Sequence, residues 1–199
     1  MENTIPKEEI EKMMNLKGKA RGMAIKGEAE FILHEKGEEG LKRLEEEMAK
    51  LGCPVDYRKM KAMSFYPVKY EGLTTLILKE VFNFSDDDFR KAGIFESKIS
   101  FILRMFLRYF YSIKSMAKEA SKIWEKYYDF GSLTVKELDE EKKQGVLVVK
   151  DFNHHPCYCR TLEGFIGSIV AMITNTDVVC REVKCPHWGH EHHEYLLKW

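Results

Sequence analysis

The stretch that decides the fold lies near the end of the chain and reads R-E-V-K-C-P-H-W-G-H-E-H-H-E-Y at residues 181–195. It is rich in thiol and imidazole side chains. Extended back to His154, this region holds four of the five Cys and six of the seven His of the chain. Zinc prefers such ligands, and Cys residues without a secretory context more often bind metal or stay free than form disulfides. The concentration therefore predicts a metal site.

The residues around this stretch predict a helix and two hairpins. Pro156 begins the helix, spaced apolar residues such as Leu162 and Ile169 give it one buried face, and the T-N-T-D sequence at 174–177 ends it. Runs of alternating apolar residues bounded by turn residues are typical of strands. The expected strands are residues 134–138, 146–152, 178–184 and 194–199.

Element lengths indicate which of these residues meet. A helix from residue 159 to 174 advances about 22 Å, and a strand from 177 to 185 returns about 26 Å. Cys185 should therefore come back beside Cys159. A loop with Pro186 then turns the chain so that His192 and His193 return to the same end of the sheet.

Spacing alone leaves the ligand set open. Cys157, His187, His190 and His192 remain alternatives. Cys180 should lie about 16 Å back along its strand and serve as a small core residue. Glu182 would point away from Cys185 in a regular strand, unless a bulge or turn precedes Pro186.

The preceding chain is predicted to be mostly helical. Ser85 and the three Asp that follow it are typical of a helix start. Apolar residues at steps of three and four from Ile99 to Trp124 predict one long central helix that ends before Gly131. Residues 21–36 can be read as helix or as strand and helix. The other expected helices are residues 5–17, 37–51, 73–82 and 85–95. The fold class is α+β, with helices packed on one antiparallel sheet.

Composition limits the classes of function. The 199 residues, 44% hydrophobic, are enough for a single domain over 1–199, with 1–52 as a candidate added helical segment and 145–199 as the zinc-binding portion. The 32 basic and 32 acidic side chains cancel, which argues against direct nucleic acid binding. No apolar run is long enough for a membrane span, and the start of the chain lacks a signal-peptide core, so we expect a cytoplasmic protein.

The sequences L-E-G-F-I-G-S at 162–168 and R-E-V-K-C-P-H-W-G-H-E-H-H-E-Y at 181–195 resemble the end of the 4-vinyl-reductase-like, hydrocarbon-binding domain family. The resemblance is specific over about residues 145–199 and loose over 20–140. It implies a fold shared with small subunits of the TRAPP vesicle-tethering complex and with haem-based nitric oxide sensors. It also implies homodimers that enclose a small hydrophobic or aromatic molecule.

The same resemblance implies a set of zinc ligands. In related phenol-responsive activators the ligands are a Cys before the helix, the Glu and Cys of a Glu-x-x-Cys strand, and a final Cys. By position these fall on Cys159, Glu182, Cys185 and His193, and the last is a change from Cys. The implied cofactor is a structural zinc. No catalytic residue transfers with the resemblance.

A ligand pocket is expected between the long helix and its neighbours. Aromatic and Met side chains are typical of apolar ligand sites, although plain core packing is the simpler interpretation of any single one. The candidate pocket residues are Phe65, Tyr66, Phe101, Met105, Tyr109, Phe110 and Phe165.

Three functions are compatible with the sequence. The first is a sensor or carrier that binds a small hydrophobic or aromatic molecule and holds a closed zinc site. The second is an enzyme, a reductase or a hydrolase, which requires an open metal position or a redox cofactor. The third is an assembly adaptor that needs no ligand. The sequence favours the first function, the sensor or carrier, and it favours a protein without enzymatic activity over an enzyme.

Overall fold

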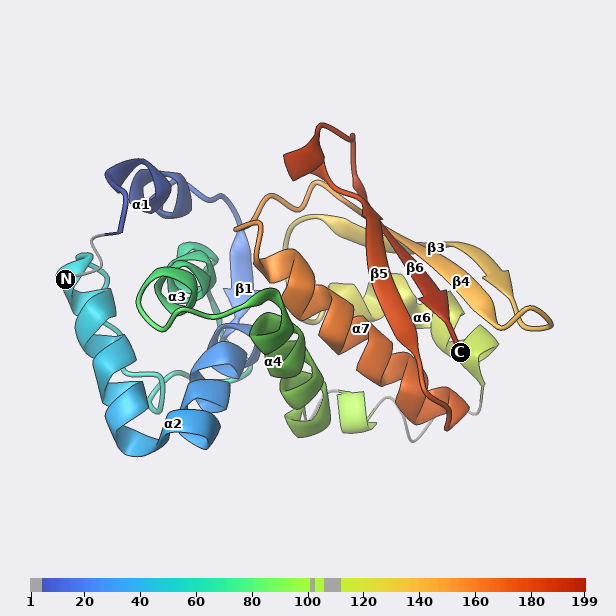
Figure 1. Ribbon diagram of the computed structural model, residues 1–199, viewed down its shortest axis with the longest axis horizontal. Helices are drawn as coiled ribbons and strands as arrows, with labels where there is room; N and C mark the ends of the chain where they lie inside the picture. The colour runs from blue at the N-terminus through green and yellow to red at the C-terminus, as the bar shows by residue number, and fades with distance from the viewer. Residues whose placement is uncertain (1–4, 101–102, 106–111) are drawn as a thin grey trace.

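The computed structural model describes residues 5–100, 103–105 and 112–199. The first part of the chain is helical and lies to one side in Figure 1, and the second part combines helices with a sheet. The elements of the first part are α1 (Lys7–Met14), β1 (Lys19–Arg21), α2 (Gly22–Lys50), β2 (Phe65–Pro67), α3 (Lys69–Glu80) and α4 (Asp86–Ile99). Those of the second are α6 (Ile113–Trp124), β3 (Ser132–Asp139), β4 (Gln144–Lys150), α7 (Tyr158–Thr174), β5 (Val179–Lys184), the 3₁₀ turn η1 (Pro186–Trp188) and β6 (His193–Lys198).

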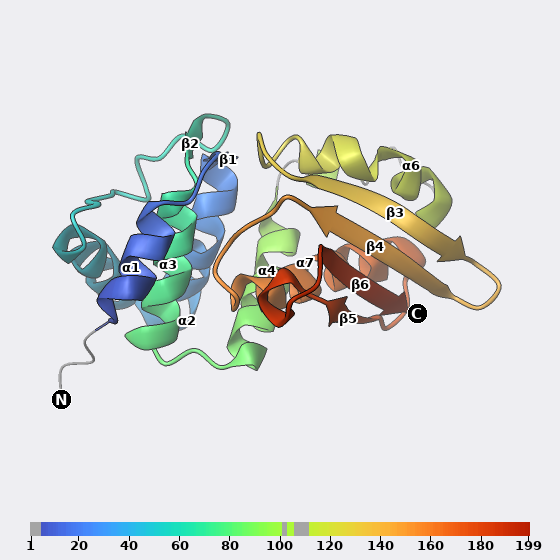
Figure 2. The same cartoon turned by 90° about the horizontal axis from the view of Figure 1, so that it is seen from above.

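The four strands of the second part form an antiparallel sheet in the order β3-β4-β6-β5. Figure 2 shows the sheet from above with α6 along one edge and α7 beneath it. Both helices contact the sheet, α6 through β3 and α7 through β5. This arrangement confirms the expected α+β class and the predicted hairpins. The short strands β1 and β2 pair separately, also antiparallel.

Most of the expected helices are present with small shifts of their ends. The segment 21–36 is helical, and it joins the next predicted helix within α2 across a break at Gly37, whose φ of 67° no helix interior adopts. Helix α4 starts as expected, because Ser85 and Asp88 form a reciprocal capping box.

The prediction of one long helix over residues 99–124 is wrong. Helix α4 ends at Ile99 because Ser100 is extended, with ψ 115°. A new helix, α6, begins after Ser112, whose side chain accepts from the Ser115 backbone N–H. Apolar spacing continues through both serines, but their backbone conformations interrupt the helix.

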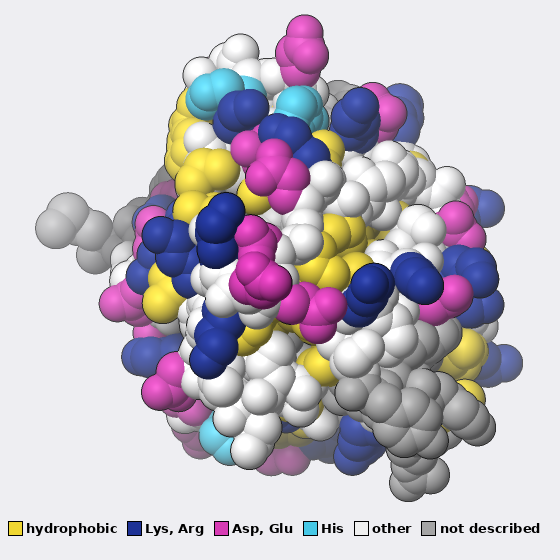
Figure 3. Space-filling model, turned by 90° about the vertical axis from the view of Figure 1, so that its right-hand side faces the viewer, with side chains coloured by type: hydrophobic (Ala, Val, Ile, Leu, Met, Phe, Trp, Pro, Cys, Tyr) yellow, Lys and Arg dark blue, Asp and Glu magenta, His cyan; other side chains and the backbone are white. Residues whose placement is uncertain are grey.

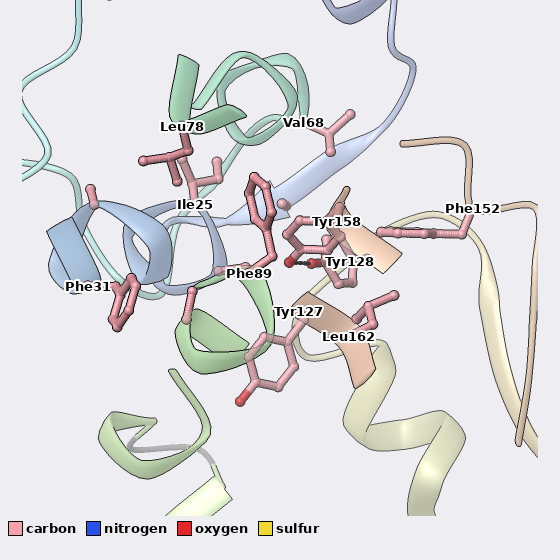
Figure 4. Close-up of a cluster of buried hydrophobic side chains, with 14 of the residues drawn as sticks. Ile25, Phe31, Val68, Leu78, Phe89, Tyr127, Tyr128, Phe152, Tyr158 and Leu162 are labelled. Atoms are coloured by element: carbon pink, nitrogen blue, oxygen red, sulfur yellow. Dashed lines mark hydrogen bonds between the residues drawn. The ribbon is translucent and has the colours of Figure 1, made fainter. Parts of the chain in front are cut away.

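Helices α4 and α7 cross at close range and join the two parts of the molecule. A Cβ on Gly93 would lie 1.9 Å from the Thr161 carbonyl oxygen, and one on Gly164 would lie 2.0 Å from the Arg90 carbonyl oxygen. Only glycine allows these backbones to approach so closely. The core around this crossing is aromatic and aliphatic; Figure 4 shows Phe89, Tyr128, Tyr158 and Leu162 meeting there.

Among the residues that the structure describes, no helix combines the length and the apolar character needed to cross a bilayer.

Candidate metal centre and ligand cavity

Four side chains from α7, β5, the residue after β5 and β6 meet at one end of the sheet. They are Cys159, Glu182, Cys185 and His193, all of them buried, and one ligand atom from each lies within 4.8 Å of all the others. Helix α7 runs away from this end and β5 returns to it, as the element lengths predict. The structure thus brings together the four residues that the sequence resemblance indicates.

The separations of the sulfur and nitrogen atoms suit a tetrahedral zinc ion. The Cys159 Sγ atom lies 3.9 Å from Cys185 Sγ and 3.7 Å from His193 Nδ1. Two ligand atoms at tetrahedral angles and usual zinc bond lengths lie about 3.5 to 3.8 Å apart. The His193 Nδ1 atom is only 2.7 Å from Glu182 Oε1, a hydrogen-bond distance that would have to widen around an ion.

A β-bulge explains how Glu182 and Cys185 face the same side. The pairing of β5 with β6 shifts register between Glu182 and Lys184, which leaves Val183 without a partner and 44% exposed. A regular strand would direct residues three apart to opposite faces. This is the irregularity on which the assignment of Glu182 depends.

The His193 ring is fixed in an orientation suited to metal binding. Its Nε2 atom lies 3.0 Å from the Phe152 carbonyl oxygen, to which an N–H at this position donates. When the ring is neutral and an ion replaces the proton that Nδ1 shares with Glu182, the lone pair belongs to Nδ1, the atom that lies near the two sulfurs. Metal-bound His residues generally make such a second hydrogen bond, which sets the tautomer.

A buried ion-pair network supports the carboxylate of the cluster. The Arg160 guanidinium contacts Glu182 Oε2 and lies 2.7 Å from Glu163 Oε1. Glu163 also accepts from the Glu182 backbone N–H at 2.7 Å and from Arg90. Arg160 therefore holds Glu182 so that its other oxygen faces the cluster. Its positive charge also offsets the charge of two thiolates and one carboxylate around a divalent ion.

Burial and mutual hydrogen bonds shift the pKa values of the four side chains in the cluster. The hydrogen bond from Cys159 lowers the pKa of the Cys185 thiol to about 7, whereas the same hydrogen bond and burial raise the pKa of Cys159. Burial would raise the pKa of Glu182, but its contacts with His193 and Arg160 outweigh burial and lower it. Burial would lower the pKa of His193, yet hydrogen bonds to Glu182 and Phe152 raise it overall. One thiol is thus ready to ionise and bind a cation.

The alternative ligands lie outside this cluster. Cys180 packs in the core against Gly167, as its position along the strand predicts. His187 and His190 are exposed on the loop between β5 and β6, and His190 Nδ1 contacts the backbone of Cys185. Figure 3 shows His side chains at the top of the face that it draws.

A cavity of about 260 Å³ lies between the sheet and helices α6 and α7. Its wall is largely apolar. Helix α6 contributes Met116 and Ala120, α7 contributes Leu162 and Ile166, and the sheet contributes Leu147. On the face shown in Figure 3, hydrophobic side chains are visible between charged ones near the middle of the view.

The candidate pocket residues are only partly placed at this cavity. Phe165 lines it. Phe65 and Tyr66 lie in β2, and Met105 is 47% exposed; none of the three is among the described residues of the cavity wall. Phe101, Tyr109 and Phe110 lie outside the described residues.

A buried polar network beside the cavity has no counterpart among the expected sites. Tyr128 and Tyr158 both donate to Glu71 Oε1, at 3.1 and 3.0 Å, and their own hydroxyl oxygens lie 2.7 Å apart. Figure 4 shows these two hydroxyls pointing at each other. His154 Nε2 lies 3.3 Å from Glu71 Oε2, and its ring stacks on Phe152.

His154 and His155 lie in the segment between β4 and α7. Both side chains are buried, at 3% and 6% exposure, and burial lowers the pKa of His155 to about 3. Phe152 contacts His154 through its ring and His193 through its carbonyl oxygen. It therefore connects the cavity wall to the candidate metal centre.

No protein-family model matches the sequence, and no curated protein matches it either. Solved structures resemble its fold. An H-NOX protein from S. oneidensis in the Fe(II)NO ligation state is 14% identical, with 89% of this chain and 98% of that chain covered and a TM-score of 0.66. The Fe(II) unliganded H-NOX protein from K. algicida is 12% identical, with 89% and 95% covered and a TM-score of 0.63.

A trafficking protein particle complex subunit 3 from Naegleria fowleri, covalently bound to palmitic acid, matches over 62% of this chain and 88% of that chain, with 14% identity and a TM-score of 0.47. That score is too low to support an argument. The H-NOX likeness shows that this chain shares the fold of these H-NOX proteins, in keeping with the fold that the sequence resemblance implies. At this identity it shows the fold alone.

Proposed function

We propose that this protein is a small-molecule-binding domain, a sensor or carrier that encloses a hydrophobic or aromatic ligand and contains one structural zinc ion. The observation that carries the proposal is the apolar cavity between α6, α7 and the sheet. Preformed apolar cavities with a few polar groups are typical of ligand sites. A volume of about 260 Å³ leaves room for a molecule of a few to a dozen heavy atoms.

The cavity wall does not suit the Fe(II) centre named for the H-NOX structures, if that iron is held in haem. Haem iron is usually bound by His or Cys, by Met only beside a His, and less often by Tyr. No His or Cys is among the described residues that line the cavity. The undescribed residues 101–102 and 106–111 contain neither. Burial raises the pKa of Tyr127, Tyr128 and Tyr158, which disfavours the phenolate that iron requires. We therefore propose a non-haem ligand.

The zinc assignment rests on the buried cluster at the end of the sheet. Two thiols, one imidazole and one carboxylate fill a tetrahedral shell completely, which is typical of structural rather than catalytic zinc. A zinc ion bound to Cys159, Glu182, Cys185 and His193 would join α7 to both final strands. It would thereby stabilise the wall of the cavity that these elements form.

Binding of a neutral fluorescent probe tests the cavity. 2-Naphthol, a fluorescent molecule that is neutral at pH 7 and small enough for this cavity, should bind the wild-type protein with a change in its emission. Ala120→Trp, which fills the cavity, should weaken binding by at least about tenfold. Ala49→Trp places the same side chain on an exposed turn of α2 and serves as the control. Equal binding by the two variants would contradict a ligand site at this cavity.

Metal content tests the zinc assignment separately. Protein purified without chelator should hold one zinc ion per chain by plasma mass spectrometry. Cys159→Ala should lose it, whereas Cys180→Ala, a buried thiol outside the cluster, should retain it. Retention by both variants, or a metal-free wild type, would contradict the assignment. The homodimer stays a prediction that the native mass of the protein decides.

A further inference from the structure

One buried carboxyl oxygen in the cavity wall has no hydrogen-bond partner among the residues that the structure describes. Glu96 of α4 lines the cavity and is 7% exposed, and its Oε1 atom has no hydrogen-bond partner among the described residues. Its carboxyl lies against Gly27, where a Cβ would come within 2.4 Å of the Glu96 Cδ atom. The absence of a side chain at Gly27 leaves room for a buried carboxyl group that has no ion-pair partner among the described residues.

The surroundings of Glu96 favour a positive charge. Carboxyl groups of Glu28, Glu71 and Glu30 lie close enough that, after burial, they contribute to raising its pKa. The single described cation of the cavity wall is Lys26, and its Nζ atom is paired with Glu30 at 3.3 Å. A buried carboxyl group without a cation stays protonated, because ionisation in an apolar site is costly. A ligand that supplies the cation removes this cost.

Polar groups gather at the same end of the cavity. The Ser100 backbone N–H donates to the Glu96 carbonyl oxygen at 3.0 Å, so Ser100 lies one turn along the chain. Its Oγ atom lies 2.6 Å from the Tyr127 hydroxyl, and both residues line the cavity. Apart from Tyr158 and Thr161, the residues that α6 and α7 contribute to the wall are aliphatic or aromatic. The cavity thus has a polar end at Glu96 and an apolar body.

We propose that the ligand is an amphiphilic amine: an apolar molecule whose protonated amino group pairs with the Glu96 carboxylate while its apolar part fills the body of the cavity. This inference rests on the proposed ligand-binding function. An anionic head group would meet several carboxyl groups. A neutral alcohol would make a hydrogen bond only about half as strong as one between two charged groups.

Three compounds of equal chain length separate these alternatives. Octylamine, 1-octanol and octanoate are titrated into the full-length protein at neutral pH by isothermal calorimetry. The wild type should bind octylamine at least about tenfold more tightly than octanol, and octanoate most weakly. Glu96→Gln, which keeps the shape of the side chain, should remove the preference for the amine. Glu30→Gln, at the partly exposed rim, should retain most of it.

The outcomes distinguish this inference from the function on which it rests. Binding of octanol and 2-naphthol without a preference for octylamine would overturn the amine assignment and leave the cavity as a ligand site. A preference that survives in Glu96→Gln would overturn it too. Failure of all four compounds to bind would overturn both. The comparison of octylamine with octanol uses the wild type alone, so it decides the point even if Glu96→Gln does not fold.

Discussion

The carboxyl group of Glu28 in α2 provides a quantitative test of the buried acidic cluster. Glu28 is 1% exposed; Thr75 Oγ1 donates to its Oε2 at 2.9 Å, and Thr161 Oγ1 lies 3.5 Å from its Oε1. Burial raises the pKa of Glu28 from the ordinary 4.5 to about 8, and the nearby Glu71 adds to the increase. Within the described part of the chain, no cation forms an ion pair with Glu28, and no cation is among the causes of its shifted pKa.

The sign of the pH effect follows from the raised pKa. A carboxyl group with a higher pKa in the folded than in the unfolded state contributes stability fully below the unfolded value, and this stability is lost as pH rises through the folded value. For Glu28 the window is pH 4.5 to about 8. At about 1.4 kcal/mol per pH unit, the free energy of unfolding should fall by roughly 3 to 5 kcal/mol between pH 5 and 8 from this group alone.

Substitution of Glu28 by Gln isolates this contribution. Gln has nearly the same shape, keeps an oxygen that accepts from Thr75, and does not ionise. In urea unfolding at pH 5, 6, 7 and 8, the stability of Glu28→Gln relative to wild type should increase with pH by roughly 3 to 5 kcal/mol. Glu30→Gln, on the partly exposed face of the same helix, should run parallel to wild type. If the Glu28→Gln and wild-type curves were also parallel, the cluster would not be buried and neutral as described.

Further predictions concern the helix crossing and the metal centre. Gly93→Ala should destabilise the fold by about 3 kcal/mol in urea unfolding, because a Cβ at residue 93 would lie 1.9 Å from a backbone atom. Gly167→Ala is the control, because the nearest atom to a Cβ there is 3.2 Å away. Equal destabilisation by the two substitutions would contradict the close helix crossing. Arg160→Met should lower stability by about 3 kcal/mol, because it leaves two buried carboxylates without this cation; an unchanged thermal midpoint would contradict the network. His193→Cys should retain zinc and His193→Leu should lose it, and equal zinc content in both would exclude His193 as a ligand.

The parts of the fold that follow local rules could be predicted from the sequence. The strands of the second part alternate in polarity and end at turn residues, and Ser85 with its acidic neighbours marks the start of α4. The same local rules could not exclude the single long helix that the sequence predicts over residues 99–124. The apolar spacing continues past Ser100 and Ser112, where the backbone dihedral angles are not helical. The periodicity of apolar residues does not reveal such a change in backbone conformation.

The candidate metal centre was predictable where chain geometry decided it. Helix and strand lengths place Cys185 beside Cys159, whereas the position of Glu182 depends on a bulge that alternation does not indicate. The network around Glu71 escaped prediction because its partner Tyr158 is 87 residues away. Two adjacent His residues beside Phe152 were the one local sign of it, and adjacent His residues are equally typical of an exposed loop.

Native mass spectrometry of the full-length protein, purified without chelator, tests the central claim most directly. The account predicts a chain mass increased by one zinc ion, and by a small organic molecule that the wild type retains and Ala120→Trp does not. A wild-type chain that carries neither, and that is indistinguishable from Ala120→Trp when 2-naphthol is added, would contradict the assignment of this protein as a zinc-containing small-molecule-binding domain.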